Sequence, residues 1–294
     1  MSKTQEIKKE ITNFRDITQT SDLISYLDDK TARLDNIKYL YHYTTLESAI
    51  RIIQSQRWLL TRAADMNDQN EYKNGDEKRW RNLFFTSFMR EDKESIGMWS
   101  MYAQPWSEGV KISIPKAAFT KWIRDTKIIN EVVWSDEEVA SGYMPTGRSV
   151  KIDNKDTRTL RISTVAYSNT ESCESSARME EKLICGGATN TKLKNAVRLP
   201  ELTGYVKDMA WSYEKEVRIK AEFDNTENFR RVAIDIPDYV ISEMIITASP
   251  LFEGNLREKL EEKISRVMKT SASLYEGKLK IKDSCERCEY KNRY

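Results

Sequence analysis

The sequence predicts a strand followed directly by a helix at Leu40-Tyr41-His42-Tyr43-Thr44-Thr45-Leu46-Glu47-Ser48-Ala49-Ile50. The aromatic and aliphatic run Tyr39–Tyr43 is typical of a strand. Thr44 then has the character of a helix N-cap, and Glu47 three residues later completes a capping box. The helix that follows has apolar residues on one face, which should pack back against the strand: Leu46, Ala49, Ile50 and Ile53.

His42 is the only histidine among the 294 residues. It lies near the C-terminal end of the predicted strand, where loops and helix N-termini converge on ligands. A lone histidine is more often a packed structural residue than a ligand-binding one. Both interpretations stay open on this stretch alone.

The composition indicates a globular chain with no dominant charge. The 48 basic and 46 acidic residues leave a net charge of +2, which does not require a nucleic-acid partner. No run approaches the roughly 18 apolar residues that span a bilayer, and the N-terminus lacks the apolar core of a signal peptide. We expect a cytoplasmic protein with no membrane partner.

The four cysteines give little support for a metal site. Cys285 and Cys288 form a single CxxC pair, with no second pair of ligands in the sequence. A structural zinc ion needs four ligands, so we expect two reduced thiols and no metal cofactor.

The remaining patterns predict an α+β fold with one domain. Residues 1–38 are expected to form an N-terminal helical extension, 39–294 the main domain, and about 116–200 an insertion within it. The segment 109–114 alternates apolar and polar residues, as a half-buried strand does. The other expected strands cover 57–61, 83–88, 131–134, 229–236, 242–247 and 278–282, and further helices cover 96–103 and 256–268.

Two glutamates mark the second stretch of interest, Trp211 to Ile219. Its alternation predicts a strand in which Glu214 and Glu216 share one face, about 6 to 7 Å apart. Two carboxylates at such a short distance must be solvated, be paired with a cation such as Arg218, or have one raised pKa. A solvent-exposed charged face on an edge strand is the alternative interpretation.

Several other chemistries find little support. The sequence has no phosphate-binding glycine loop and no serine in a GxSxG context. A metal-dependent nuclease would need clustered acidic ligands, for which Asp65, Asp68 and Glu71 are the candidates. These three residues are equally typical of a loop whose side chains cap its own backbone.

The chain resembles the bacterial domain-of-unknown-function family 2971 (DUF2971) over about residues 39–250. The family pattern has a YHYT-like start, an Asn-Asp-Pro loop, an apolar strand before MWxxYA, and a W-Y-E-x-E-x-R segment. Here Gln69 stands where the family usually has proline, and no motif covers 116–200. The matching stretches are Tyr41–Thr44, Met66–Asp68, Phe84–Phe88, Met98–Ala103 and Trp211–Arg218.

The first motif also resembles the opening of nucleic-acid-modifying and diphtheria-toxin-type ADP-ribosyltransferases. That resemblance implies a split, mostly antiparallel β-sheet flanked by helices, with NAD as the substrate. It implies that His42 hydrogen bonds with the nicotinamide ribose, that Glu216 stabilises the ribose cation, and that Glu214 positions or deprotonates the acceptor. The remaining residues that the resemblance assigns to NAD binding are Tyr43, Thr44, Thr86, Ser87, Trp99 and Tyr102.

On this resemblance the protein would be a toxin or phage-defence effector that modifies nucleic acid or protein, with an antitoxin as a further partner. The alternative from another class is a non-catalytic domain that binds a nucleotide or nucleic acid in an aromatic pocket. Basic residues near the first motifs would suit a nucleic-acid backbone, although acidic residues are interspersed with them: Arg57, Arg62, Lys73, Lys78, Arg79 and Arg81.

Overall fold

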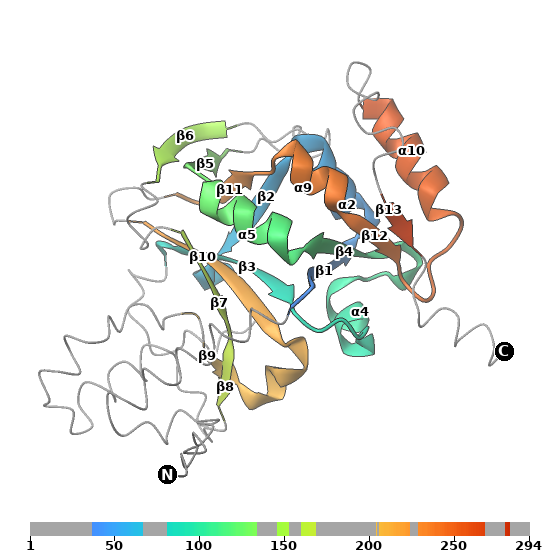
Figure 1. Cartoon of the computed structure of the whole chain (residues 1–294), viewed down its shortest axis with the longest axis horizontal. Helices are drawn as coiled ribbons and strands as arrows, with labels where there is room; N and C mark the ends of the chain where they lie inside the picture. The colour runs from blue at the N-terminus through green and yellow to red at the C-terminus, as the bar shows by residue number, and fades with distance from the viewer. Residues whose placement is uncertain are drawn as a thin grey trace, which may run out of the picture.

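The stretch around His42 folds as a strand followed directly by a helix, β1 (Tyr39–Thr45) and α2 (Leu46–Ser55) (Figure 1). The computed structural model describes residues 37–66, 81–133, 146–152, 160–168, 204, 206–223, 229–267 and 280–282. The four apolar positions predicted to face inward on α2 are all buried. The expected N-terminal helices at 1–38 lie outside the described residues, apart from the last two positions.

The N-cap of α2 is Thr45, so the predicted cap at Thr44 is wrong by one residue. The Thr45 side chain accepts a hydrogen bond from the backbone N–H of Ser48. Glu47 therefore does not complete a capping box, and it pairs instead with Arg51 one turn further along. The strand continues through Thr44 because Thr44 still pairs with Val110 of the neighbouring strand.

A large, mostly antiparallel sheet organises the described part of the chain (Figure 1). Its strand order is β13-β12-β4-β1-β3-β2-β11-β5-β6, and β10 pairs with β3 and with β7. Within this sheet only β12 and β13 run parallel. The strands are β2 (Arg57–Arg62), β3 (Leu83–Met89), β4 (Gly109–Pro115), β5 (Ile128–Val132), β6 (Thr146–Lys151), β7 (Leu160–Thr164), β10 (Glu216–Glu222), β11 (Val232–Asp235), β12 (Ile245–Ala248) and β13 (Lys280–Lys282).

Helices pack on this sheet, which confirms a mixed α/β fold. Phe119 and Trp122 of α5 contact Phe88 and Trp58 of the sheet edge to face, within one large apolar core. A smaller aromatic cluster lies under α4. The helices after α2 are α4 (Ile96–Tyr102), α5 (Lys116–Asp125), α9 (Asp238–Glu243) and α10 (Leu256–Val267), with short 3-10 turns η2 (Ala63–Asp65), η4 (Trp106–Glu108) and η6 (Met209–Glu214).

The sheet divides around β3. One edge of β3 pairs with β10 along its whole length. On the other edge, β2 pairs only at Phe84 and Phe85, and β1 pairs only at Met89. Since β1 and β2 thus meet β3 at opposite ends, no strand of the described residues pairs with the edge of β3 around Ser87.

Several predicted elements differ from the structure in extent. β4 is buried along nearly its whole length rather than half-buried, because β1 and β12 flank it and Lys111 is held in a buried ion pair with Glu94. The expected strand at 242–247 begins at Ile245, because α9 takes up the residues before it. The strand expected at 131–134 runs from Ile128 to Val132.

The range predicted as an insertion contributes strands to the main sheet. β5 pairs with β11, and β7 pairs with β10. A separate two-stranded parallel sheet follows, made of β8 (Ala166–Ser168) and β9 (Val206–Asp208). Residues 169–203 lie outside the described part, so the division into extension, domain and insertion stays a prediction. In the described part of the chain, no helix is both long and apolar enough to cross a membrane.

Candidate functional site

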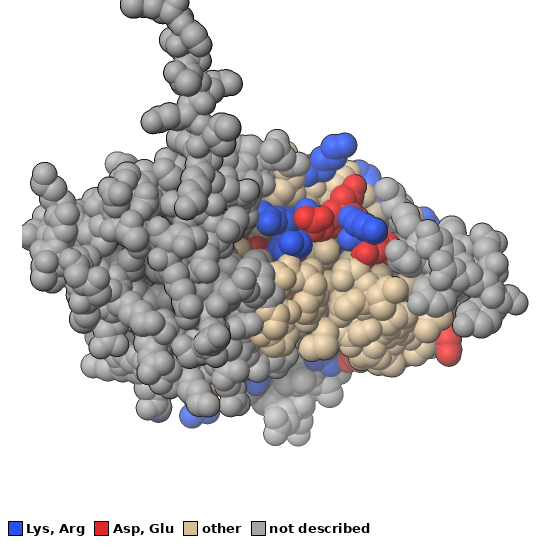
Figure 2. All heavy atoms as spheres, turned by 90° about the horizontal axis from the view of Figure 1, so that it is seen from below, with Lys and Arg blue, Asp and Glu red and all other residues tan. Residues whose placement is uncertain are grey.

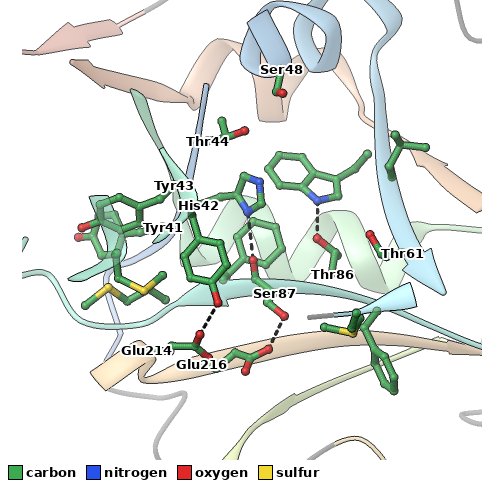
Figure 3. Close-up of a pocket in the computed structure, with 18 of the residues that line it drawn as sticks. Tyr41, His42, Tyr43, Thr44, Ser48, Thr61, Thr86, Ser87, Glu214 and Glu216 are labelled. Atoms are coloured by element: carbon green, nitrogen blue, oxygen red, sulfur yellow. Dashed lines mark hydrogen bonds between the residues drawn. The ribbon is translucent and has the colours of Figure 1, made fainter. Parts of the chain in front are cut away.

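A cavity of about 450 Å³ lies where β1 and β2 separate from β3 (Figure 3). Its walls come from β1, α2, β2, η2, β3, α4, β9, η6 and β10, so segments far apart in the sequence meet there. The lining is largely aromatic and aliphatic, with a small number of polar groups. That mixture is typical of a site for a small molecule.

His42 projects from β1 into this cavity with a fixed tautomer. Its Nδ1 donates a hydrogen bond to the backbone carbonyl of Ser87, 3.1 Å away, which β1 and β2 leave unpaired. A carbonyl can only accept, so in the neutral ring Nδ1 carries the proton and Nε2 is an acceptor. Burial lowers the pKa of His42, with the hydrogen bond to Ser87 opposing it in part. The ring packs edge to face on Trp58.

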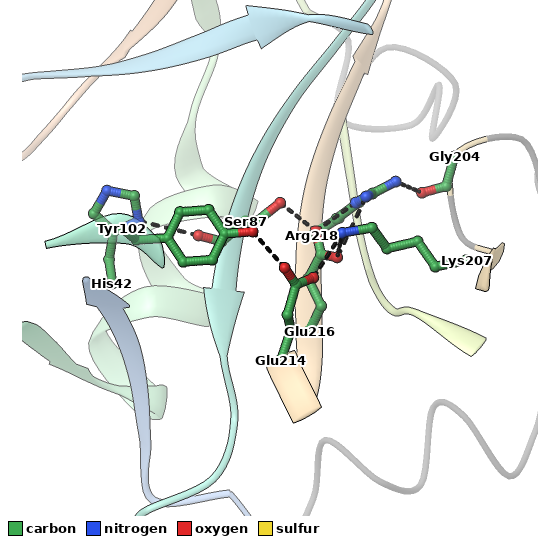
Figure 4. Close-up of polar contacts among 8 residues, drawn as sticks. All are labelled: His42, Ser87, Tyr102, Gly204, Lys207, Glu214, Glu216 and Arg218. Carbon is green, nitrogen blue, oxygen red and sulfur yellow. Dashed lines mark hydrogen bonds and ion pairs between the residues drawn. The ribbon is translucent and has the colours of Figure 1, made fainter. Parts of the chain in front are cut away.

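Glu216 lies on the other side of Ser87 and is held as a carboxylate. The Ser87 hydroxyl and the Arg218 guanidinium both donate to its Oε1 (Figure 4). Burial by itself would raise the pKa of Glu216, but the charges of Arg218 and Lys207 and these hydrogen bonds outweigh it and hold the pKa at about 2. Ser87 therefore holds His42 through its carbonyl and Glu216 through its hydroxyl.

Glu214 sits beside Glu216 with a different environment. Tyr102 donates its hydroxyl to Glu214, and the Lys207 ammonium lies 2.6 Å from Glu214 and 3.3 Å from Glu216. Burial raises the pKa of Glu214, and the Lys207 charge lowers it in part. Repulsion from the Glu216 carboxylate raises the pKa of Glu214 further. The two carboxylates thus differ in their readiness to take a proton.

Glu214 and Glu216 do not share a strand, which corrects the predicted alternation from Trp211 onward. Met209–Glu214 forms the 3-10 turn η6, and β10 begins only at Glu216. Lys215 between them adopts a left-handed conformation with φ of 44°, which ends the turn. The exposed edge-strand alternative is also wrong, since each glutamate is 3% exposed and β10 has a partner on both sides.

Eight of the nine predicted site residues line the cavity, and Trp99 does not. Trp99 is fully buried beneath the ring of Tyr43, which it contacts edge to face. Of the two aromatic residues that α4 contributes to the predicted NAD site, only Tyr102 reaches this space. The eight that line it are His42, Tyr43, Thr44, Thr86, Ser87, Tyr102, Glu214 and Glu216.

The family model with the description "Protein of unknown function (DUF2971)" matches residues 98–219. This part of the chain belongs to the DUF2971 family. The DUF2971 match spans the elements from α4 to most of β10, and so includes Tyr102, Glu214 and Glu216. It confirms the predicted family over a shorter range than 39–250, and His42 precedes it. No curated protein and no solved structure matches the chain.

Sequence reasoning missed the cation that joins the two glutamates. Lys207 belongs to the DUF2971 segment but to no motif recognised in it, and it reaches the carboxylates from the small β8–β9 sheet. Its ammonium also lies 4.7 Å from the centre of the Trp211 ring, a cation-π contact. Two buried carboxylates require a buried cation. The sequence alone could not identify which lysine supplies it.

The other predicted sites are tested only in part. Asp65 lines the cavity, whereas Asp68 and Glu71 lie outside the described residues, as do Cys285 and Cys288. Among the residues the structure describes, no three histidine, cysteine, aspartate or glutamate side chains are grouped to hold a metal ion.

The predicted basic surface is partly committed to contacts within the chain. The Arg62 guanidinium donates to the backbone carbonyl of Phe229, and Arg57 lies 3.4 Å from the Asp235 carboxylate. The described region does not extend to Lys73, Lys78 and Arg79.

Proposed function

We propose that the protein is an NAD-dependent ADP-ribosyltransferase whose reaction takes place in the cavity at the β3 split. The observation that carries the proposal is the shared attachment of His42 and Glu216 to Ser87. One residue thereby fixes a neutral hydrogen-bond acceptor and an anion beside the same space. Both are the groups that the ADP-ribosyltransferase resemblance assigns to the nicotinamide ribose.

The charges suit the cleavage of NAD. The bond between ribose C1′ and the nicotinamide nitrogen breaks, its electron pair stays with that nitrogen, and neutral nicotinamide leaves. Positive charge develops on the ribose, and a fixed carboxylate such as Glu216 stabilises it best in a water-poor site. His42 Nε2 would accept a hydrogen bond from a ribose hydroxyl and orient the sugar.

The second half of the reaction would use Glu214. Ribose C1′ bonds to an oxygen or nitrogen of the acceptor, and the proton released from that atom passes to Glu214. A base works best when its pKa lies near the working pH, which the raised pKa of Glu214 favours. Tyr102 would pack against nicotinamide while its hydroxyl orients Glu214.

We extend the proposal to a biological role as a toxin or phage-defence effector that acts on nucleic acid or protein. An antitoxin protein is the partner that this role calls for. The aromatic cavity and the cations of Lys207 and Arg218 also fit a second candidate, a domain that binds a nucleotide without cleaving it. These cations offset part of the negative field that catalysis requires.

The test is nicotinamide release from NAD by the wild-type protein and by Glu216→Gln, with RNA, DNA and protein offered in turn as acceptors. Loss of the carboxylate charge should reduce release at least about a hundredfold. Glu222→Gln, on the same strand β10 but outside the cavity, is the matched control and should keep wild-type activity. Circular dichroism and thermal melting establish that each variant is folded.

Release that depends on Glu216 and on one acceptor class supports the transferase and identifies its substrate. Equal release by wild type and Glu216→Gln would overturn the assignment of Glu216. NAD binding without any release, from folded wild-type protein, would favour the binding domain instead.

A further inference from the structure

The wall of the cavity formed by β1 and α2 carries the hydroxyl of a largely buried threonine, which no part of the proposed reaction uses. Thr44 is 8% exposed and lines the cavity, and among the described residues its side chain has no hydrogen-bond partner. His42 and Thr44 are two positions apart on β1, so both point to the same face of the strand. Figure 3 shows Thr44 between His42 and the first turn of α2.

The first turn of α2 adds positive charge at the same place. This helix is ten residues long, and its N-terminal amides carry a partial positive charge that attracts anions. Ser48 and Arg51, one turn apart, both line the cavity. Arg51 pairs with Glu47, whose side chain is 60% exposed. An ion pair with so much exposure to water is weak, so Arg51 can give up Glu47 and bind a ligand instead.

The acidic groups of the cavity come from other elements. Asp65 belongs to η2, Glu214 to η6 and Glu216 to β10, whereas β1 and α2 contribute no carboxylate to the lining. The cavity therefore has donors and positive charge on the α2 wall, whereas Glu214 and Glu216, bridged by Lys207, lie on the opposite wall (Figure 3). A ligand with an anion at one end and a cation at the other would bind in one orientation.

We infer that the α2 wall is an anion subsite that takes the diphosphate of a nucleotide, with Thr44, the first turn of α2 and Arg51 as its donors. The identity of that nucleotide as NAD rests on the proposed function. In this orientation the pyridinium of NAD faces Glu214 and Glu216. NAD in its reduced form has a neutral ring and loses that attraction.

The experiment measures binding calorimetrically with inorganic pyrophosphate, ADP and adenosine as probes. Wild-type protein should bind ADP at least about tenfold more tightly than adenosine, since adenosine has no phosphate. Thr44→Val removes the hydroxyl with little change in shape, and Arg51→Gln removes the charge. Each should weaken ADP binding about tenfold and leave adenosine binding unchanged.

Two matched controls separate this effect from a loss of folding. Thr247→Val changes a threonine of similar burial on β12, and Arg124→Gln removes an exposed arginine on α5. Neither residue lines the cavity, so both variants should bind ADP as wild type does. Equal affinity of wild type for ADP and adenosine would overturn the subsite, as would wild-type ADP affinity in the Thr44→Val, Arg51→Gln double variant.

The ADP-binding measurements test the subsite separately from the proposed catalysis. ADP binding that requires Thr44 and Arg51, without nicotinamide release, would support the anion subsite and contradict the transferase activity. Nicotinamide release with an unchanged KM for NAD in both variants would support the transferase activity and contradict the anion subsite.

Discussion

The imidazole of His42 is half-buried and neutral, and the stability of the fold should depend on its staying neutral. An unfolded chain binds a proton at histidine below about pH 6.5, whereas the folded protein resists protonation until a lower pH. Stability should therefore fall as the pH drops through about 6.5. His42→Asn keeps an N–H donor for the Ser87 carbonyl but cannot titrate, so its melting temperature should fall less between about pH 7.5 and about pH 5.5.

Because the chain has one histidine, proton NMR follows this group without assignment. The midpoint of its single imidazole signal should lie well below about 6.5. A midpoint at or above that value, together with equal pH dependence of the two melting temperatures, would contradict a neutral ring held by Ser87.

At the scale of the element, the N-cap of α2 separates the prediction from the structure. Thr45→Ala should lower the free energy of unfolding by about 1 kcal/mol, since the Ser48 N–H loses its partner. Thr45→Ser retains the hydroxyl and should restore most of the loss. Urea unfolding measures both, and an alanine variant as stable as the serine variant would exclude the cap.

Element type could be predicted from periodicity, and element ends could not. The buried faces of α2 and the apolar run of β3 follow directly from their side-chain patterns. The alternation from Trp211 to Ile219 is also present, yet the left-handed backbone at Lys215 divides it into a turn and a strand. A lysine side chain does not favour a left-handed backbone. Tertiary contacts therefore impose this conformation, and the sequence does not reveal them.

At the scale of the whole molecule, the small β8–β9 sheet is joined to the main sheet by buried charge. Lys207 of β9 bridges Glu214 and Glu216, and Arg218 of β10 donates to the carbonyl of Gly204. Lys207→Met should lower the free energy of unfolding by about 3 to 5 kcal/mol near pH 7, because it leaves two buried carboxylates with one cation fewer.

That loss should be smaller at about pH 5.5 than near pH 7, since Glu214, whose pKa is raised, takes up a proton at a higher pH than an ordinary carboxyl. Lys121→Met is the control, because the Lys121–Asp125 pair on α5 is exposed and should contribute less than about 1 kcal/mol. Urea unfolding at the two pH values measures both variants. A pH-independent loss in Lys207→Met would show that packing, rather than charge, holds the two sheets together.

Sequence motifs identified eight of the residues around the cavity but not what connects them. His42, Ser87 and Glu216 are separated by 45 and 129 positions, and only the strand order brings them together. Lys207 belongs to no repeated pattern, and Trp99 resembles a ligand-stacking residue in sequence although it is buried in a separate cluster. Such distinctions arise from strand pairing, which local patterns do not encode.

The double attachment at Ser87 makes the two halves of the cavity unequal in their tolerance of genetic change. The contact to His42 uses a main-chain carbonyl, which all twenty amino acids possess, so it survives any substitution at position 87 that keeps the strand. The contact to Glu216 uses the hydroxyl, which serine shares with few other residues. Random variation at this codon would thus erode the acidic half first, while the histidine stays oriented.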